Sequence, residues 1–161
     1  MPMPRKCRGD TLVEVLITVL ILAVGVLGVA GMQVTTLQNL NSSYSASVAG
    51  IIAEDLSERM RANPTAALAG TYVHSAAPVT YPDCVANVCN LGDLATYDVG
   101  SWWAALTAVL PSATGQVTRN AGTNTFVVTV RWDEDRNGSS GTSCPVLSAA
   151  DLECYQFNIT I

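Results

Sequence analysis

An uninterrupted apolar run near the amino terminus constrains this chain more than any other feature. Val15 to Met32 holds eighteen residues without a charge, and Thr18 is its only polar side chain. At 1.5 Å per residue, about 20 helical residues span the roughly 30 Å hydrocarbon core of a bilayer. A buried core helix is the alternative, but such a helix usually keeps a polar face, which this run lacks. The run therefore predicts a membrane-spanning helix.

Basic residues before this run set its orientation. Arg5, Lys6 and Arg8 precede the apolar segment, so the positive-inside rule predicts residues 1–9 in the cytoplasm and the chain beyond about Gln33 on the far side. A secretory signal peptide has a shorter apolar stretch of about 7–15 residues before its cleavage site. Here the helical pattern continues past the run, so we expect a retained, single-pass anchor.

The charge balance excludes a nucleic-acid partner. The 161 residues contain 13 acidic and 8 basic side chains, for a net charge of −5. Three of the basic residues lie in the first nine positions, and the rest of the chain has five Arg, no Lys and a net charge of −8. Binding to a phosphate backbone needs clustered cations, because affinity comes from counterion release.

One acid interrupts the start of the apolar segment. Glu14 lies two residues after Leu12, where an ionised carboxylate costs several kcal/mol unless it finds a partner or a proton. Glu14 is therefore a candidate functional residue. The alternative is that it lies at the headgroup boundary and reaches water.

The residues around Glu14 follow a known pattern. Residues Arg5 to Leu16 resemble the class III signal of type IV prepilins, in which a short basic leader ends in Gly and a Thr-Leu-x-Glu sequence starts a hydrophobic helix. Leu22 to Gln33 and Asp55 to Pro64 are similar to the PilV family of minor pilins, the type IV pilus modification proteins. The leader is shared with type II secretion pseudopilins, whereas the Glu58 to Pro64 stretch favours a PilV-like chain.

The resemblance implies roles for three amino-terminal residues. Prepilin peptidase would cut after Gly9, so that Asp10 becomes the first mature residue and Glu14 the fifth. In this family the acid at that place pairs with the free amino-terminal amine of a neighbouring subunit. Asp10 departs from the family pattern, because the first mature residue is usually Phe and is methylated on its amine.

The resemblance also implies a structural function without catalysis or a cofactor. The chain would be a minor pilin that primes or modifies pilus assembly for twitching motility and adhesion. Its partners would be other minor pilins, the major pilin, prepilin peptidase, the inner-membrane assembly platform and a tip adhesin. It would be stored in the bacterial inner membrane with its head in the periplasm, and then reach the cell-surface fimbrium. The alternatives are a type II secretion minor pseudopilin and a membrane-tethered periplasmic binding module whose anchor is not cleaved.

The helical pattern continues beyond the apolar run. Large apolar residues recur at spacings of three and four, which predicts an amphipathic face: Leu37, Leu40, Tyr44, Val48, Ile51, Ile52, Leu56 and Met60. Asn63 and Pro64 supply the stop, because the residue before Pro is disfavoured in helical geometry. One helix of about 78 Å is expected from Thr11 to Ala62. Gly25, Gly28 and Gly31 either unwind it locally or allow close helix packing.

The remaining residues predict a small α+β head, as in the type IV pilin fold. We expect a short helix from Trp102 to Leu110, capped by Asp98 or Ser101 and ended before Pro111. Alternating residues predict strands over 116–119, 124–132 and 155–161, the first two joined as a hairpin. Their antiparallel sheet would pack on the outer half of the long helix. The predicted segments are a leader (1–9), a transmembrane or filament-core helix (10–34), its amphipathic continuation (35–63) and the head (64–161).

Four cysteines lie in the exported part: Cys84, Cys89, Cys144 and Cys154. An even number in an oxidising compartment predicts disulfides, and the favoured pairing of nearest neighbours is one of three. Zinc is the alternative, although no Cys-x-x-Cys pair is present and His74 is the only histidine. Cys7 would leave with the leader.

Two weaker signals remain in the head. Asp133, Asp135 and Asn137 match the opening half of a calcium loop, but Cys144 stands where the bidentate Glu belongs, so a polar turn is the commoner interpretation. Trp102 and Trp103 mark either a binding surface or the core. A single His and no nucleophile or phosphate-binding motif leave nothing from which to build an active site.

Overall fold

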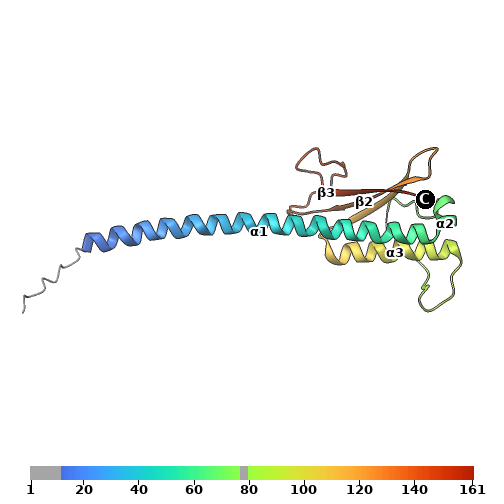
Figure 1. Ribbon diagram of the computed structural model, residues 1–161, viewed down its shortest axis with the longest axis horizontal. Helices are drawn as coiled ribbons and strands as arrows, with labels where there is room; N and C mark the ends of the chain where they lie inside the picture. Colours follow the sequence, from blue (N-terminus) through green and yellow to red (C-terminus); the bar gives the residue numbers. More distant parts are fainter. Residues whose placement is uncertain (1–11, 77–79) are drawn as a thin grey trace, which may run out of the picture. The chain divides into compact units, whose positions relative to one another are not determined.

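The computed structural model describes residues 12–76 and 80–161. Its elements are α1 (Leu12–Ala62), α2 (Pro64–Leu68), α3 (Leu91–Val109), β1 (Thr114–Arg119), β2 (Thr125–Trp132) and β3 (Glu153–Thr160) (Figure 1). A long amino-terminal helix with a small antiparallel sheet confirms the predicted α+β fold. The chain divides into two compact units between Asn41 and Ser42, so α1 contributes to both of them.

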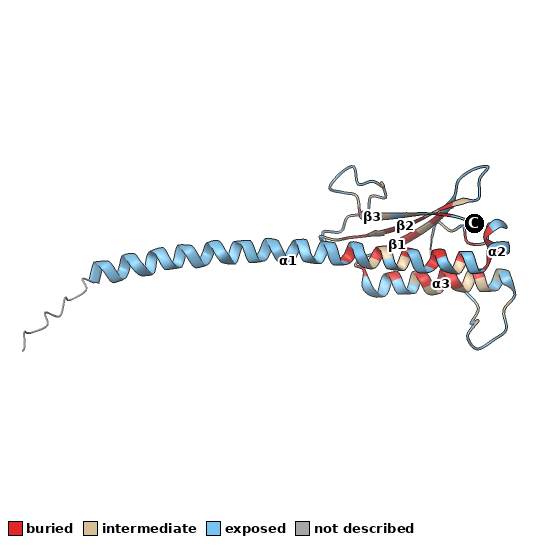
Figure 2. Cartoon of the chain, in the orientation of Figure 1, coloured by how far each residue is buried: buried red, intermediate tan, exposed pale blue. Residues whose placement is uncertain are grey.

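In the first unit, α1 is helical at each described residue. The helix passes through Gly25, Gly28 and Gly31 without the local unwinding that these glycines could allow. A Cβ added at any of the three would meet nothing within 4 Å. The described residues of this unit, 12–41, are all exposed (Figure 2).

In the second unit, α1 buries Leu56 and Met60, as the apolar pattern predicts, together with four small residues. The buried positions of the helix are Ser45, Ala49, Ala53, Leu56, Ser57 and Met60. The expectation that Tyr44 and Ile51 lie on the core face is wrong, since they are 68% and 66% exposed. Small side chains let the neighbouring elements approach the helix backbone closely, and Trp102 Nε1 donates to the Ile52 carbonyl at 3.0 Å.

The second long helix begins earlier than predicted. α3 starts at Leu91 because the Asn90 side chain accepts a hydrogen bond from the Asp93 N–H at 2.8 Å, which caps the first turn. Asp98 and Ser101 were expected as caps, but both lie inside the helix. The predicted end before Pro111 is confirmed.

The sheet has the order β1-β2-β3, and both pairs are antiparallel. The predicted hairpin joins β1 to β2, with Asn120 N–H donating to the Thr125 carbonyl at 2.9 Å. The alternating residues Phe126, Val128 and Val130 are fully buried on one face, as the period-two pattern predicts. Each strand differs from its predicted bounds by only one or two residues.

Two glycines mark where helices press on the inner face of this sheet. A Cβ on Gly115 of β1 would lie 2.4 Å from the ring of Trp102, so α3 packs directly on β1. A Cβ on Gly50 of α1 would lie 3.4 Å from the ring of Tyr155, so α1 packs against β3. Trp102 is 1% exposed and belongs to the core, whereas Trp103 is partly buried at its edge.

We expect Gly115→Ala to destabilise the head. The added methyl overlaps a buried indole ring that is also tied to α1, and overpacking of a well-packed core typically costs about 1–3 kcal/mol. Chemical denaturation of the full chain in detergent, followed by tryptophan fluorescence, measures the change.

Gly92→Ala is the matched control, because a Cβ there meets only the Asn90 side chain at 3.4 Å. We expect its unfolding free energy to lie within about 1 kcal/mol of the wild type. Equal stability of Gly115→Ala and Gly92→Ala would contradict the packing of Trp102 on β1.

Candidate functional site

The residues expected to direct assembly lie at the start of the chain. Gly9 and Asp10 lie outside the described residues. Glu14 lies in the first turn of the described part of α1, and its side chain is exposed. The structure therefore places Glu14 at the amino-terminal end of the apolar helix, with its carboxylate accessible to another molecule.

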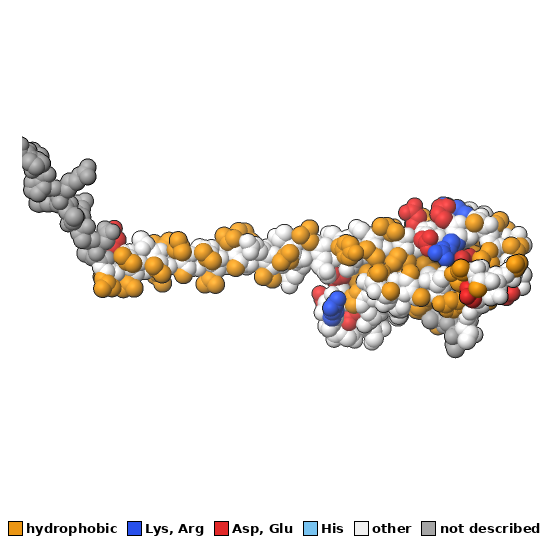
Figure 3. Space-filling model, turned by 90° about the horizontal axis from the view of Figure 1, so that it is seen from below, with side chains coloured by type: hydrophobic (Ala, Val, Ile, Leu, Met, Phe, Trp, Pro, Cys, Tyr) orange, Lys and Arg blue, Asp and Glu red, His pale blue; other side chains and the backbone are white. Residues whose placement is uncertain are grey.

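The surface that follows Glu14 is apolar from Val15 to Met32, where Thr18 is the only polar side chain. Each large apolar side chain described between Leu12 and Leu40 is at least 50% exposed. Figure 3 shows such side chains along the length of this part of the helix. α1 is long and apolar enough to cross a membrane, and its most apolar 18-residue window has no buried residue. An apolar surface of this size marks contact with a membrane or with other protein chains.

The Glu58 to Pro64 stretch forms a joint between α1 and the rest of the head. Arg59 reaches α3, where its guanidinium contacts the Asp98 carboxylate at 3.4 Å and the Ser101 hydroxyl at 3.0 Å. It also pairs with Asp55 at 2.9 Å. Burial alone would lower the pKa of Arg59, but the two carboxylates outweigh it and raise that pKa, so the residue stays charged.

Tyr72 completes this joint from the chain between α2 and α3. Its hydroxyl donates to Asp98 Oδ2 at 2.7 Å, and the whole side chain is buried. Desolvation raises the pKa of Tyr72 well above its usual value, and the neighbouring Asp98 carboxylate raises it further. The phenol therefore remains a donor throughout the physiological pH range.

Asn63 and Pro64 make the turn out of α1. The Asn63 side chain accepts from the Ala66 N–H and donates to the Leu91 carbonyl at 2.8 Å, so one buried amide links α2 to the start of α3. Pro64 occupies the first turn of α2, where its missing N–H has no consequence. Met60 lies fully buried beneath this joint. The stretch thus orients α1 against the head.

Both nearest-neighbour disulfides are present. Cys84 bonds to Cys89 across a Cα–Cα distance of 5.4 Å, and Cys144 bonds to Cys154 across 5.9 Å. The second bridge ties the 139–152 loop to β3. Because these sulfurs are bonded to each other, they offer no thiolates for the alternative zinc site.

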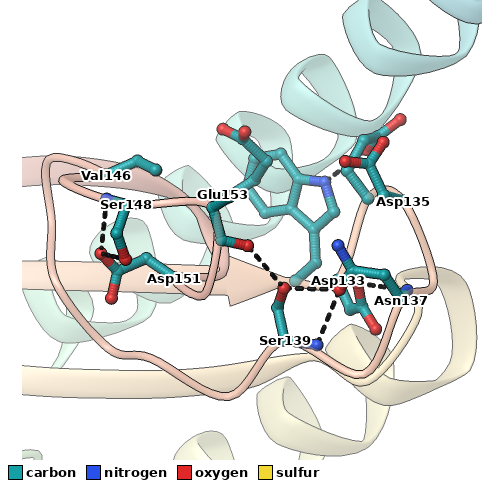
Figure 4. A pocket seen from close by; sticks show the side chains of 11 residues that line it. Asp133, Asp135, Asn137, Ser139, Val146, Ser148, Asp151 and Glu153 are labelled. Carbon is teal, nitrogen blue, oxygen red and sulfur yellow. Dashed lines mark hydrogen bonds between the residues drawn. The ribbon is translucent and has the colours of Figure 1, made fainter.

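The calcium candidate forms a polar turn. Figure 4 shows Asp133, Asn137 and Ser139 facing one another beside β2. The Asp133 carboxylate accepts from the N–H groups of Asn137 at 3.3 Å and Gly138 at 2.9 Å. Asp135 is exposed in the same turn. Among residues 12–76 and 80–161, no group of three or more His, Cys, Asp or Glu side chains is arranged to hold a metal.

A second carboxylate organises the neighbouring loop. Asp151 accepts from the Leu147 and Ser148 N–H groups at 3.2 and 3.0 Å and from the Ser148 hydroxyl at 3.1 Å. Desolvation is the largest single influence and raises its pKa, but the hydrogen bonds together outweigh it and lower the pKa below its usual range. The loop therefore holds its shape by local hydrogen bonds together with the Cys144–Cys154 bridge.

The sequence did not predict the cap of α3 or the Tyr72–Asp98 contact of the joint. Asn90 and Asp93 have the spacing of a helix cap, an acceptor followed three residues later by an acid, so their pattern could have located the start of α3. No local sequence pattern predicts that Tyr72 and Asp98 are buried together, because their contact joins residues 26 positions apart in the chain.

The fold and the exposed helix together define a class of protein. A long amino-terminal helix with an apolar first half, followed by a small head with a three-stranded antiparallel sheet, is the architecture of type IV pilins. Two family models match adjoining parts of this chain: the prokaryotic N-terminal methylation motif over residues 4–30, and the family described as type IV pilin Tt1218 over residues 31–100. Over these residues the chain is similar to type IV pilins, which are structural proteins, and the matches support a pilin subunit. No significant match was found among curated proteins or solved structures.

We expect Tyr72→Phe to change how stability depends on pH. The pKa of Tyr72 is raised in the folded state, so the tyrosine stabilises the fold fully below about pH 10 and progressively less above it. The unfolding free energy of the wild type should therefore fall by up to about 1.4 kcal/mol per pH unit above pH 10. Denaturation curves from pH 8 to 11 should show a smaller slope for Tyr72→Phe, and equal slopes would contradict the buried Tyr72–Asp98 contact.

The two carboxylates that flank Arg59 should differ in their effect on stability. Asp98→Ala removes a buried acceptor and leaves the Tyr72 hydroxyl without its partner, which typically costs about 2–3 kcal/mol. Asp55→Ala removes a half-exposed ion pair and should cost below about 1 kcal/mol. Urea denaturation of both variants compares them, and equal losses would show that Asp98 does not anchor the joint.

Proposed function

We propose that the chain is a minor type IV pilin that primes or modifies pilus assembly. The observation that carries this proposal is the apolar run of α1 from Val15 to Met32, which is exposed along its length and preceded by one acid, Glu14. Such a helix needs lipid or other helices around it, and a pilin exchanges the first for the second when it enters a filament. The matched N-terminal methylation motif supports the same function.

In this proposal, processing creates the group that Glu14 recognises. Cleavage after Gly9 leaves Asp10 with a free amine, and the Glu14 carboxylate of one subunit pairs with the amine of the next. Both charges are costly in an apolar environment, so each relieves the desolvation of the other when they meet. Glu14 therefore fixes the axial position of each incoming helix. Asp10 places a second acid beside the same amine and competes for it within its own subunit.

The small residues of α1 favour close contacts between such helices. Gly25 opens a shallow apolar groove lined by Leu22, Val26 and Val29. In the absence of a Cβ, a neighbouring helix can approach the backbone closely, and van der Waals contacts then replace those made with lipid. We therefore assign Gly25, Gly28 and Gly31 to helix packing rather than to local unwinding.

The proposed location and partners follow from this role. The anchor places the head on the periplasmic side of the inner membrane, and assembly brings it to the cell surface. The partners are prepilin peptidase, the assembly platform, the major pilin, other minor pilins and a tip adhesin. The resemblance of the Glu58 to Pro64 stretch to PilV-like chains favours a minor pilin over a type II secretion pseudopilin.

Glu14→Gln tests the proposed pairing. This substitution keeps the size of the side chain and removes its charge, so we expect normal membrane insertion and about tenfold less protein in sheared filaments, the size of loss that 1.4 kcal/mol produces. Quantitative immunoblotting of membrane and filament fractions measures the ratio.

Thr18→Val is the matched control, because Thr18 lies one turn further along the same face and its hydroxyl bonds only to the Val15 carbonyl. It should enter filaments as the wild type does. Equal incorporation of Glu14→Gln and the wild type would rule out the pairing.

A further inference from the structure

The two edges of the sheet differ in whether another segment pairs with them. On the β1 edge, Val117 exchanges two backbone hydrogen bonds with His74, at 2.8 and 3.1 Å, so a segment of the head covers that side. On the other edge, β3 pairs with β2 and with no further strand in the described part of the chain. Among the described residues, the β1 edge is therefore covered at Val117, whereas the β3 edge is paired with no further strand.

The register shows which groups β3 presents at its open edge. Ile161 N–H donates to the Asn124 carbonyl at 3.1 Å. The backbone N–H and C=O groups of Ile161 and of every second residue before it therefore point toward β2. The N–H and C=O groups of Gln156, Asn158 and Thr160 consequently point away from the sheet. They make no backbone hydrogen bond to any residue that the structure describes.

β3 also lacks the features that usually prevent edge-to-edge pairing. Proteins protect open edges with Pro, Lys, inward-pointing charges or bulges. β3 has eight residues in continuous register with β2, contains no Pro or Lys, and has a single charged residue, Glu153, at its start. Its exposed side chains in the middle, Gln156 and Asn158, are neutral. An unprotected edge of this length is suited to receive another strand.

The side chains beside this edge leave room for an incoming strand. Tyr155 and Phe157 are only partly buried on the helix-facing side of β3. The ring of Tyr155 lies against Gly50 of α1, which has no side chain. Ser47 and Glu54 lie on the same helix stripe as Gly50, at spacings of three and four, and both are exposed. Apolar side chains of an added strand would cover the two aromatic rings and the surface around Gly50.

We propose that the open edge of β3 binds an extended segment of another protein as a fourth strand of the sheet. The segment pairs through its backbone with Gln156, Asn158 and Thr160. It carries apolar residues at alternate positions, which face α1, and a basic residue, because Glu54 on the helix stripe of Gly50 and Glu153 at the start of β3 are both acidic and exposed. This binding goes beyond the role in filament assembly and does not depend on it, since the edge belongs entirely to the second compact unit.

A synthetic peptide tests the proposal on the full-length protein in detergent micelles. The probe is Lys-Val-Thr-Val-Thr-Val-Thr-Lys, and the readout is amide hydrogen exchange by NMR. Binding should slow the exchange of the Gln156, Asn158 and Thr160 amides by about tenfold or more, whereas the amides of Tyr155, Phe157 and Ile159, which already face β2, should change little. No binding, or binding without protection of those three amides, would overturn the proposal.

A pair of substitutions at one position isolates the backbone contact. Asn158→Pro removes an N–H that points away from β2, so the sheet itself keeps its hydrogen bonds, and peptide affinity should fall about tenfold or more. Asn158→Ala keeps the N–H and should bind within about twofold of the wild type. Equal affinity of the Pro and Ala variants would contradict strand addition.

A second comparison leaves the protein unchanged. Methylation of alternate backbone nitrogens blocks hydrogen bonding along one edge of the extended peptide. The set methylated on the edge that faces β3 should lose binding, and the set methylated on the opposite edge should retain it. Equal binding of both sets would contradict the proposal. The three amides could instead be protected without peptide, and sedimentation could show dimers that Asn158→Pro dissociates. That result would mean that a second copy occupies the edge, and it would overturn the choice of partner.

Discussion

The rest of the structure depends on one constraint: the first half of α1 cannot remain in water. Its apolar side chains from Leu12 to Leu40 are exposed around the whole helix, and each square ångström of such surface costs roughly 25 cal/mol when it meets water rather than an apolar environment. Within the second unit, the head packs on α1 between Ser45 and Met60. The first half of α1 needs a membrane or other protein chains around it.

The joint at the end of α1 makes the head rigid enough to accompany that helix. Arg59 binds Asp98 and Ser101 on α3, while Asn63 links α2 to the start of the same helix. These polar contacts depend on direction, whereas apolar packing does not. The buried Tyr72 hydroxyl donates a hydrogen bond to the second oxygen of the Asp98 carboxylate. The head is thus held to the end of α1 by a small set of hydrogen bonds and ion pairs. The two disulfides act locally, each within its own loop.

Most of the fold could be predicted because it follows from short-range patterns. Eighteen apolar residues, a stop at Pro64 and period-two alternation in β2 each determine an element without reference to the rest of the chain. The buried face of α1 could be found only in part: the spacing of apolar residues predicted Leu56 and Met60, but Ser45, Ala49, Ala53 and Ser57 are buried because they are small. The resemblance to prepilins located Gly9, Asp10 and Glu14, but the Tyr72–Asp98 contact needed three dimensions. The open edge of β3 likewise emerges only from the register of its hydrogen bonds with β2.

The amino terminus of the mature protein tests the central claim most directly. Protein purified from membranes and from sheared filaments of the same cells is analysed by amino-terminal sequencing and intact mass. Our account predicts that the filament fraction begins at Asp10 and lacks the nine-residue leader. A filament fraction that begins at Met1 or Met3, or fibre-forming cells in which the shortened chain never appears, would contradict it.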